Sequence, residues 1–358
     1  MPTKKTSVFD CLEWLAPGTN LREGLESILT AKIGALIVVG DSEEVMNVVD
    51  GGFLINREYS AAHLYELAKM DGAIVLDKER KRILYANSLL IPEPSIATTE
   101  TGTRHKSAER TAKQTNELVI CISQRRNIIS LFKGKEKYVL RDTPSIINKA
   151  NQALQTLEKY NSVLDTAINN LNLLEMDDLV TLDVVTNVIK RVEMVMRIVD
   201  EIHRYIAELG FEGRLIRMQL EELLKGREHT EKLVISDYMK PVGKSITADK
   251  ILTSIRNLSY EQLNDTFFIA NELGYSQGDK AHEISMKTRG YRIMSKIPKL
   301  SMAIITKVIQ NLGDLNSIMN ATVEELDAIE GIGRFRAMTI KDGLRRVRDQ
   351  LFIDSRYI

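Results

Sequence analysis

The hydrophobic and polar positions divide the chain into three regions with different periods. Up to about residue 140, short apolar runs typical of strands alternate with stretches of helical composition. From about Pro144 the apolar positions follow a heptad spacing, and from about Gly290 they fit short helices separated by turns. The pattern predicts an α/β amino-terminal domain (1–143), an all-α helical spine (144–288) and a small helix-hairpin-helix domain (289–358).

The first region is predicted to contain a mixed sheet. Some intervals, such as that between Leu76 and Ile83, are too short for a helical crossover, so neighbouring strands there must form hairpins. The predicted strands are Ile33–Val39, Gly72–Leu76, Ile83–Ala86, Leu118–Ser123 and Ile128–Phe132, and the predicted helices are Ala61–Met70 and Ser107–Thr115.

The middle region is predicted to form two long helices, each with one heptad seam. Each seam must be buried, either in an intramolecular bundle or against another subunit. Asn161, a polar residue inside the first seam, is interpreted as a device that fixes register. The first seam comprises Ile147, Ala150, Leu154, Leu157, Asn161, Leu164, Ile168 and Leu171. The second comprises Val185, Val188, Val192, Val195, Val199, Ile202, Ile206 and Leu209, starts near Asp183 and ends at Gly210.

The last region ends in two helices joined by a glycine-containing turn. Thr322 and Glu325 form a capping box at the start of a helix through Ile329, and Gly331-Ile332-Gly333 leads directly into the helix Arg334–Leu351. Glycines let a ligand approach the backbone closely, and the first amides of a helix attract anions. The residues expected to surround such an anion are Gly331, Gly333, Arg334, Lys341 and Arg345.

A DNA phosphate fits this anion site, so the pattern predicts salt-dependent DNA binding through the backbone rather than the bases. The alternative is an ordinary tight turn with a solvated basic face. Upstream, Ile297-Pro298-Lys299-Leu300 occupies the place of a first hairpin but lacks both glycines. That segment, which precedes a helix predicted over Lys299–Asn311, is expected to act structurally and to bind phosphate weakly if at all.

Charge supports a local rather than a global affinity for nucleic acid. The 358 residues include 49 basic and 49 acidic side chains, so no net charge attracts DNA or a membrane. Residues 289–358, however, carry twelve basic and eight acidic side chains, a net charge of +4 that leaves −4 for the rest of the chain.

Composition excludes several other classes of protein. A hydrophobic content of 44% and a charged content of 27% are ordinary for globular domains and exclude a disordered or collagenous chain. The longest apolar run, near Ala35 to Val39, is far shorter than the ~20 residues of a membrane span, and Met1 to Lys5 precede no signal-like hydrophobic region. The sequence predicts a cytoplasmic protein without a membrane partner, in which Cys11 and Cys121 are buried free thiols.

Two short segments of the first region carry candidate chemistry. Arg104, His105 and Lys106 cluster at the predicted start of a helix, where cations are unfavourable unless an anion such as a triphosphate is present. Ser107 is expected to cap that helix, and the hydroxyls of Thr103 and Ser107 to donate to the anion. A solvated basic loop is the alternative, because the chain contains neither a P-loop nor a Gly-x-Gly-x-x-Gly turn.

The other segment is Asp71-Gly72-Ala73, at the entrance of a predicted strand. An aspartate followed by small residues could hold a metal while a sugar or phosphate approaches the backbone, although Asp-Gly is also a common turn.

Together these segments resemble the DisA family of diadenylate cyclases. The resemblance rests on Asp71-Gly72-Ala73, on Thr103–Arg110, on a helical middle and on the terminal hairpin, and it extends over almost the whole chain, including His63–Met70 and Leu84–Asn87. The family pattern is Asp-Gly-Ala and Arg-His-Arg, whereas Lys106 replaces the last arginine here. Lysine lacks the planar fork of arginine, so Lys106 should contact a phosphate loosely or not at all.

The resemblance implies condensation of two ATP molecules into cyclic di-AMP, with release of two pyrophosphates, between two facing domains. It implies Asp71 as the ligand of Mg²⁺ or Mn²⁺ and as activator of the 3′-hydroxyl, and Arg104 and His105 as triphosphate contacts. The further nucleotide-binding positions that it implies are Gly72, Ala73, Leu90, Thr103, Lys106, Ser107 and Ser123. It also implies an octamer of two facing tetramers, inhibition by branched DNA and association with the nucleoid.

Two other functions are considered. A non-catalytic DNA-binding scaffold with a nucleotide-sensing domain would explain Lys106, but the intact Asp71, Gly72 and Arg104 argue against it. A repair nuclease would need an acidic cluster near the basic region, and the sequence offers none there.

Overall fold

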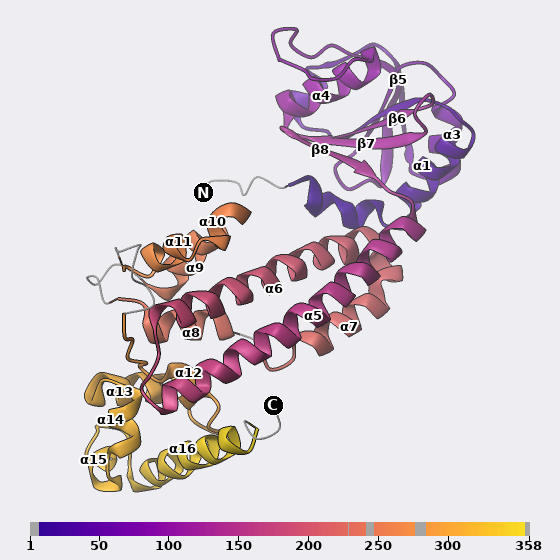
Figure 1. The fold of residues 1–358 in the computed structure, drawn as a ribbon. Coiled ribbons are helices and arrows are strands. Elements are labelled where there is room, and N and C mark those ends of the chain that lie inside the picture. Colours follow the sequence, from indigo (N-terminus) through magenta and orange to yellow (C-terminus); the bar gives the residue numbers. More distant parts are fainter. Residues whose placement is uncertain (1–6, 228, 241–246, 276–283, 355–358) are drawn as a thin grey trace. The chain divides into compact units, whose positions relative to one another are not determined.

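The structure, a computed structural model, describes residues 7–227, 229–240, 247–275 and 284–354. Met1 to Lys5 and Arg356, which is one of the twelve basic side chains of residues 289–358, lie outside these ranges. Contacts group the chain into two compact units, Met1–Leu154 with Glu201–Gln219 and Gln155–Asp200 with Leu220–Ile358 (Figure 1). The division into domains at residues 143 and 288 stays a prediction.

The first unit is built on an eight-stranded sheet, which is mixed as predicted. Its order is β2-β5-β4-β1-β6-β7-β8, with β3 paired to β5. Strands β1 and β4 are parallel and the other pairs are antiparallel. The strands are β1 Ala35–Val39, β2 Val49–Asp50, β3 Phe53–Glu58, β4 Ala73–Leu76, β5 Arg82–Leu90, β6 Leu118–Ser123, β7 Ile128–Lys133 and β8 Glu136–Leu140.

The predicted strand Ile83–Ala86 is too short. Asn87 has the positive φ of a turn residue, 57°, yet the strand β5 continues past it to Leu90. A register shift against β4 at this point absorbs the irregularity, so the turn-like residue is a bulge within the strand. The short or exposed strands β2, β3 and β8 were also not predicted, because they lack long apolar runs.

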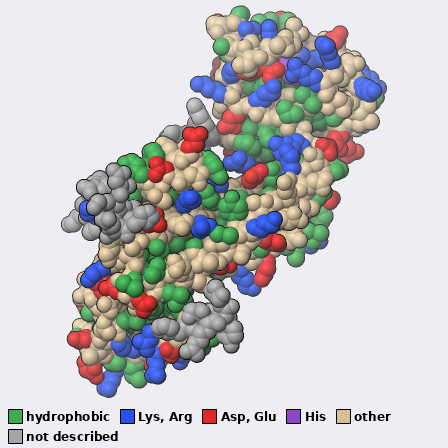
Figure 2. Space-filling model, viewed as in Figure 1, with side chains coloured by type: hydrophobic (Ala, Val, Ile, Leu, Met, Phe, Trp, Pro, Cys, Tyr) green, Lys and Arg blue, Asp and Glu red, His purple; other side chains and the backbone are tan. Residues whose placement is uncertain are grey.

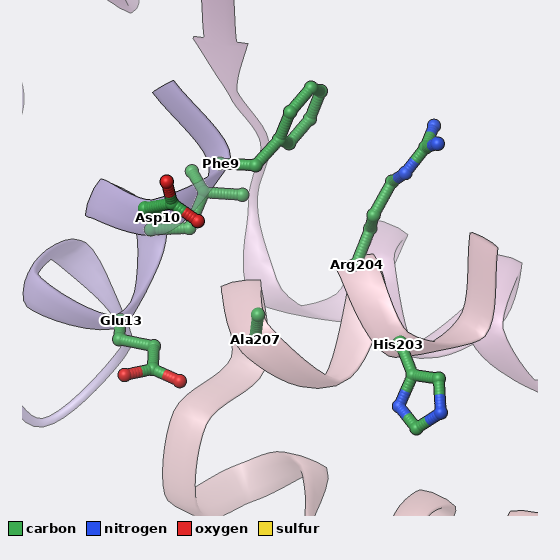
Figure 3. A pocket seen from close by; sticks show the side chains of 7 residues that line it. Phe9, Asp10, Glu13, His203, Arg204 and Ala207 are labelled. Carbon is green, nitrogen blue, oxygen red and sulfur yellow. The ribbon is translucent and has the colours of Figure 1, made fainter. Parts of the chain in front are cut away.

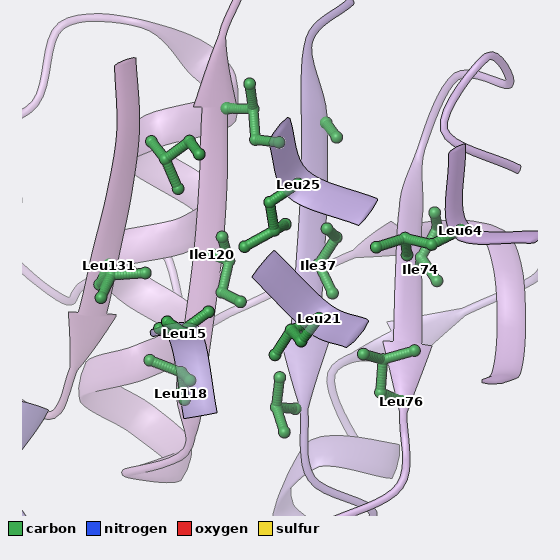
Figure 4. Packing of buried hydrophobic residues seen from close by; sticks show 14 of the residues in the cluster. Leu15, Leu21, Leu25, Ile37, Leu64, Ile74, Leu76, Leu118, Ile120 and Leu131 are labelled. Carbon is green, nitrogen blue, oxygen red and sulfur yellow. The ribbon is translucent and has the colours of Figure 1, made fainter. Parts of the chain in front are cut away.

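Helices cover both faces of this sheet (Figure 1). The 3₁₀ helix η1 (Val8–Leu15), α1 (Asn20–Thr30) and α3 (Ala61–Leu67) bury their apolar residues on one face. Figure 4 shows Leu21 and Leu25 of α1 packed over Ile37 and Ile120 of the sheet. On the other face, α4 (Thr103–Thr115) packs through Ala108 and Ala112, and α2 (Glu43–Met46) follows β1.

Both cysteines are buried free thiols, as predicted. Cys11 belongs to the cluster under α1 and Cys121 to the cluster under α4. Burial raises the pKa of the Cys11 thiol to about 11 and that of Cys121 to about 12, so both stay protonated near neutral pH. Neither thiol is a candidate nucleophile.

The two long predicted helices are present. Every residue of the second seam is buried, and Gly210, with φ of 55°, ends its helix. The first seam is less regular, because Ile147 and Ile168 are only half-buried. The helices between strand β8 and the carboxy-terminal group are α5 Thr143–Met176, α6 Leu182–Leu209, η2 Gly210–Gly213, α7 Arg214–Leu224, α8 Thr230–Tyr238, α9 Ala248–Arg256, α10 Tyr260–Asn264 and α11 Thr266–Glu272.

Asn161, interpreted as a device that fixes register, contacts the helix α7. Its side-chain amide donates to the carbonyl of Leu223, at the end of α7, over 3.1 Å. The last carbonyl groups of a helix have no donor within the helix, so the buried amide of Asn161 supplies one for Leu223.

The carboxy-terminal helices share one apolar core. They are α12 Tyr291–Ser295, α13 Met302–Leu312, α14 Leu315–Asn320, α15 Val323–Asp327 and α16 Arg334–Asp354. The predicted capping box of α15 is present: Glu325 N donates to the Thr322 hydroxyl over 3.2 Å, and Thr322 N donates to the Glu325 carboxylate over 2.7 Å. Ile297 is buried against Gly343 of α16, which gives the segment before α13 the structural role expected of it.

A buried polar network connects this core to α5 and α8 within the second unit. The guanidinium of Arg292 contacts Glu175 and donates to Asn172 over 2.5 Å. Asp237 accepts the backbone amides of Tyr291 and Arg292 over 2.6 and 3.1 Å. Removing α12 would therefore leave buried carboxylates without their partners.

No helix in the described ranges is long and apolar enough to cross a membrane.

Candidate functional site

The predicted nucleotide residues lie at the end of the sheet where the strands β1 and β4 begin and where β5 and β6 end. We refer to this end of the strands as the sheet edge. Strand β4 starts at Ala73, which lies beside Leu36 of β1 and opposite Ser88 of β5. Strand β6 ends beside the start of β1, where Ile122 pairs with Ala35. Asp71-Gly72, Leu90 and Ser123 are therefore brought to the same edge from three different strands, although the sequence separates them by up to about fifty residues.

Gly72 owes its identity to close packing. Its φ is 98°, and a Cβ at this position would lie 2.8 Å from the carbonyl carbon of Asn87 and from the carbonyl oxygen of Ser88. Only glycine fits this approach of the chain to β5 without a shift of the backbone. The side chain of Ala73 is buried under α4, so Ala73 can offer a ligand only its backbone.

Asp71 is exposed at this edge. Within the described ranges, no hydrogen bond or ion pair is recorded for its carboxylate, and no group of three or more His, Cys, Asp or Glu side chains could hold a metal ion. Mg²⁺ is commonly held by one or two carboxylates together with substrate phosphates and waters. Asp71 fits a metal that arrives with a phosphate ligand and does not fit a site built from protein groups alone.

The predicted helix start at Ser107 is wrong. Helix α4 begins at Thr103, with Gly102 as its N-cap, and the Lys106 amide donates to the Gly102 carbonyl over 2.8 Å. Ser107 lies inside the helix, and its hydroxyl donates to the Leu90 carbonyl over 3.4 Å. Serine is the stronger N-cap by preference, but Gly102 already has the extended backbone that a cap requires. The cationic residues thus lie within the first helical turn.

Arg104 crosses the start of β1. A Cβ on Gly34 would lie 2.2 Å from the Arg104 Nη1 atom, and the carbonyl of Ile122 borders the same space. The half-buried guanidinium is therefore held at the sheet edge close to the strand ends. Gly34 was missed in the sequence, where a single glycine before a strand gives no functional signal.

His105 does not belong with the cations. Its ring is buried and packs edge-on against Phe132 at 6.4 Å between centroids, and its Nε2 atom has no hydrogen-bond partner among the residues that the structure describes. Burial lowers the pKa of His105 below 6.5, and Arg126, Lys137 and Arg104 lower it further against the opposing effect of Glu100. His105 is neutral at neutral pH, so the predicted cluster of three positive charges contains two.

The remaining predicted contacts differ in accessibility. Thr103 is exposed, and Lys106 is half-buried in the first turn of α4. The Ser123 hydroxyl accepts the Arg126 amide over 3.2 Å and so closes the turn between β6 and β7. The Leu90 side chain is buried, and its carbonyl is the acceptor for Ser107.

The outer face of α4 holds the segment that follows β5. Glu109 accepts the Thr98 hydroxyl over 2.5 Å and the Thr99 amide over 3.1 Å. Lys113 donates to the Ala97 carbonyl over 2.8 Å and pairs with Glu109 over 2.7 Å. These residues have a structural role that the sequence did not reveal, which is to fix the segment leading into the first turn of α4.

The first unit also contains a cavity of about 430 Å³ between η1 and the end of α6. Figure 3 shows Phe9, Asp10 and Glu13 on one side and His203 and Arg204 on the other. The Arg204 guanidinium lies 5.3 Å from the centre of the Phe9 ring. None of the predicted nucleotide residues lines this cavity.

At the carboxy-terminal turn, Gly331 has φ of 86°, and Gly333 has no atom within 4 Å of a Cβ built on it. Arg334 and Arg345 are exposed, and Arg336 donates to the Gly331 carbonyl over 2.9 Å. The Lys341 ammonium donates to the Met319 carbonyl over 2.7 Å, and its expected place beside an anion at the turn stays a prediction.

Lys307 takes a position beside the turn that the sequence did not indicate. Its ammonium donates to the Glu330 carbonyl over 3.3 Å and lies 3.2 Å from a Cβ built on Gly331. Basic and acidic side chains are interspersed on the face of the carboxy-terminal helices visible in Figure 2. Acidic side chains therefore lie among the basic ones on this face.

Comparison with known proteins gives matches along the chain. Residues 22–137 match the family model described as DisA bacterial checkpoint controller nucleotide-binding, and residues 140–282 match the DisA bacterial checkpoint controller linker region. A DNA integrity scanning protein DisA from Acetivibrio thermocellus is 55% identical, covering 99% of this chain and 98% of the relative. Proteins of the same name from Clostridium botulinum and Carboxydothermus hydrogenoformans are 53% and 54% identical, covering 99% and 95% of this chain and 99% and 96% of the relatives.

Proposed function

The chain belongs to the DisA family of DNA integrity scanning proteins and carries its nucleotide-binding domain, and from this premise we propose that it is a diadenylate cyclase. The reaction joins two ATP molecules into cyclic di-AMP and releases two pyrophosphates. The observation that carries this proposal is the placement of an available carboxylate, Asp71, at the sheet edge where Arg104 and the first turn of α4 also lie.

Each residue at this edge has a distinct role in the proposal. Arg104 and the first amides of α4 bind the triphosphate, with the Thr103 hydroxyl as a further donor. Asp71 holds a divalent metal and accepts the proton of the attacking 3′-hydroxyl. Bound Mg²⁺ or Mn²⁺ would neutralise charge on the phosphates and on the leaving pyrophosphate.

His105 supports the site in a different way. Because its neutral ring is buried beside Phe132, we assign it to fixing the first turn of α4, with a phosphate contact only through a neutral N–H. Lys106 supplies charge without a bidentate fork. Replacing Lys106 by arginine should therefore change the cyclase rate by less than about threefold, under 0.7 kcal/mol in the barrier.

The chemistry requires two copies of the domain. A 3′-hydroxyl of one ATP must attack the α-phosphorus of the other, so two sheet edges must face each other. Exposed apolar side chains on the neighbouring strands β3 and β5, namely Phe53, Leu54 and Leu89, with Ile91 just beyond, support such an apolar contact. We propose a homo-oligomer, an octamer of two facing tetramers.

The carboxy-terminal turn is proposed to be a helix-hairpin-helix that binds DNA phosphates. Gly331 and Gly333 open the backbone, Arg334 and Lys307 surround it, and α16 presents its first amides. Branched DNA bound there would inhibit synthesis, with the helical region as the connection. Because ATP and chromosomal DNA are both ligands of the proposal, we place the protein in the cytoplasm at the nucleoid.

Incubation of the full chain with ATP and Mn²⁺, followed by mass analysis for cyclic di-AMP, tests the enzymatic proposal. The product should form with Mg²⁺ or Mn²⁺ and disappear when the metal is chelated. Intact ATP bound by a protein that makes no product would instead favour the non-catalytic scaffold. The cyclase rate with and without added branched DNA then tests the regulatory part.

A further inference from the structure

Phe335 is an exposed aromatic side chain in the first turn of α16. The side chain is 82% exposed, and both neighbours along the chain, Arg334 and Arg336, are exposed arginines. Met338, one turn further along the same helix face, is also exposed. A single exposed apolar residue needs no explanation in general, but this one lies directly after the Gly331-Ile332-Gly333 turn.

The location restricts what could cover this ring. The first amides of a helix have no acceptor within the helix, so the N–H groups of Gly333, Arg334 and Phe335 remain available for a ligand at the start of α16. Lys307 and Arg336 add charge at the turn, where they contact the carbonyls of Glu330 and Gly331. An occupant of this surface must therefore be anionic and must also offer a flat apolar face.

We propose that Phe335 stacks on an unpaired or partly unstacked base of DNA whose phosphate is bound at the Gly331–Gly333 turn. This inference rests on the proposed DNA binding and adds a specificity-determining residue to it. Within a continuous duplex the faces of the bases are covered by their neighbours, whereas a branch point exposes them. A phenylalanine can stack on an exposed base or wedge into an open step, and it does so for any base.

The backbone of the Gly331–Gly333 turn and the side chain of Phe335 would therefore contribute differently to DNA binding. The turn and its cations bind any DNA through phosphates, and their contribution weakens with salt. Phe335 contributes only where a base is accessible, so it discriminates branched from continuous DNA. The net charge of the segment supplies affinity but no such discrimination.

Binding of the full chain to three DNA probes tests this inference. The probes are a forked duplex with unpaired thymines at the fork, the same fork with abasic residues in their place, and a continuous duplex of matched length. Phe335→Ala should weaken binding to the thymine fork by about fivefold or more and change binding to the other two probes by less than about twofold. Phe335→Trp should retain the preference for the thymine fork.

Phe211→Ala is the matched control, because Phe211 is 81% exposed but lies in η2, in the first unit. It should leave binding to all three probes unchanged. Equal losses on all probes for Phe335→Ala, equal binding of both forks by the unchanged protein, or an altered oligomeric state of Phe335→Ala would overturn the inference. If the unchanged protein bound none of the probes, the proposed DNA binding itself would fail. DNA binding without any effect of Phe335→Ala would remove only the role of Phe335.

Discussion

The two candidate sites are constructed in opposite ways. The amino-terminal site combines Gly34, Asp71, Leu90 and Arg104, which come from different strands and from α4 and meet only because the sheet places their ends together. The carboxy-terminal site is almost continuous in sequence, from the capping box at Thr322 to the first turn of α16. A convergent site depends on the packing of a whole domain, whereas a local site depends on one turn. A substitution at one site should therefore change the function proposed for that site, cyclic di-AMP synthesis or DNA binding, and leave the other function unchanged.

The largest effect is expected from Asp71→Asn at the convergent site. An amide is a poorer metal ligand and cannot accept the proton, so cyclic di-AMP formation should fall by far more than tenfold, while ATP binding and the melting temperature change little. Asp41→Asn is the control, because Asp41 is an exposed aspartate after the other end of β1. A variant with more than about a tenth of the original rate, a loss below about 1.4 kcal/mol in the barrier, would contradict the role of Asp71.

The next effect concerns the local site and uses Gly333→Val. No atom lies within 4 Å of a Cβ at Gly333, so the helices should still form, but the side chain would keep a phosphate from the first amides of α16. Affinity for DNA should fall by about tenfold or more, about 1.4 kcal/mol, with the basal cyclase rate unchanged. Gly331→Val is a less selective change, because φ of 86° strains any other residue there.

The point variant also tests regulation more selectively than a deletion of residues 290–358 would. That deletion would remove Arg292 from Glu175 and the amides that satisfy Asp237, and it would therefore disturb the helical region as well. The cyclase rate of Gly333→Val should no longer respond to branched DNA at matched salt. A response equal to that of the unchanged protein would show that regulation does not pass through this turn.

A smaller effect is expected from Gly34, which couples to Arg104 only through the tertiary structure. Gly34→Ala would place a Cβ 2.2 Å from Nη1 and displace the guanidinium, so it should reproduce part of the loss caused by Arg104→Ala. Each variant should weaken ATP binding by several-fold, about 1 kcal/mol, without weakening adenosine binding. Calorimetric titration of the double variant should give no more loss than Arg104→Ala alone. Additive losses would mean that the two residues act separately.

The smallest effect is a pH dependence of stability that arises at His105. Burial lowers its pKa below 6.5, so the unfolded chain binds more protons in acid and stability falls as the pH drops through 6.5. Between pH 7.5 and 5.5 the difference in proton binding at His105 should lower the free energy of unfolding by about 1 kcal/mol or less. His105→Gln should remove that part of the decrease. Thermal unfolding at several pH values measures it, with the exposed His63→Gln as control. An unchanged pH dependence in His105→Gln would contradict this assignment.

Much of the fold was predictable because it depends on local spacing. The second heptad seam is buried at every position, the capping box of Thr322 and Glu325 is present, and the apolar runs around Ile37 and Ile120 are central strands. Periodicity and capping act over a few residues, so the sequence contains them directly. The prediction was wrong where a local preference competed with a neighbour, as at Ser107, where Gly102 caps the helix instead, and at Asn87, where a turn residue became a bulge.

The sequence by itself determined which candidate groups the chain carries, namely Asp71-Gly72-Ala73, the cations before Ala108 and the glycine turn at Gly331. The tertiary structure alone decided what each of these groups can do. It placed Gly34 under Arg104, buried His105 beside Phe132 so that the pKa of its ring is lowered, and directed Lys341 to the Met319 carbonyl. These outcomes depend on desolvation and on contacts between residues distant in sequence, and both arise only when the sheet edge and the helical core have formed.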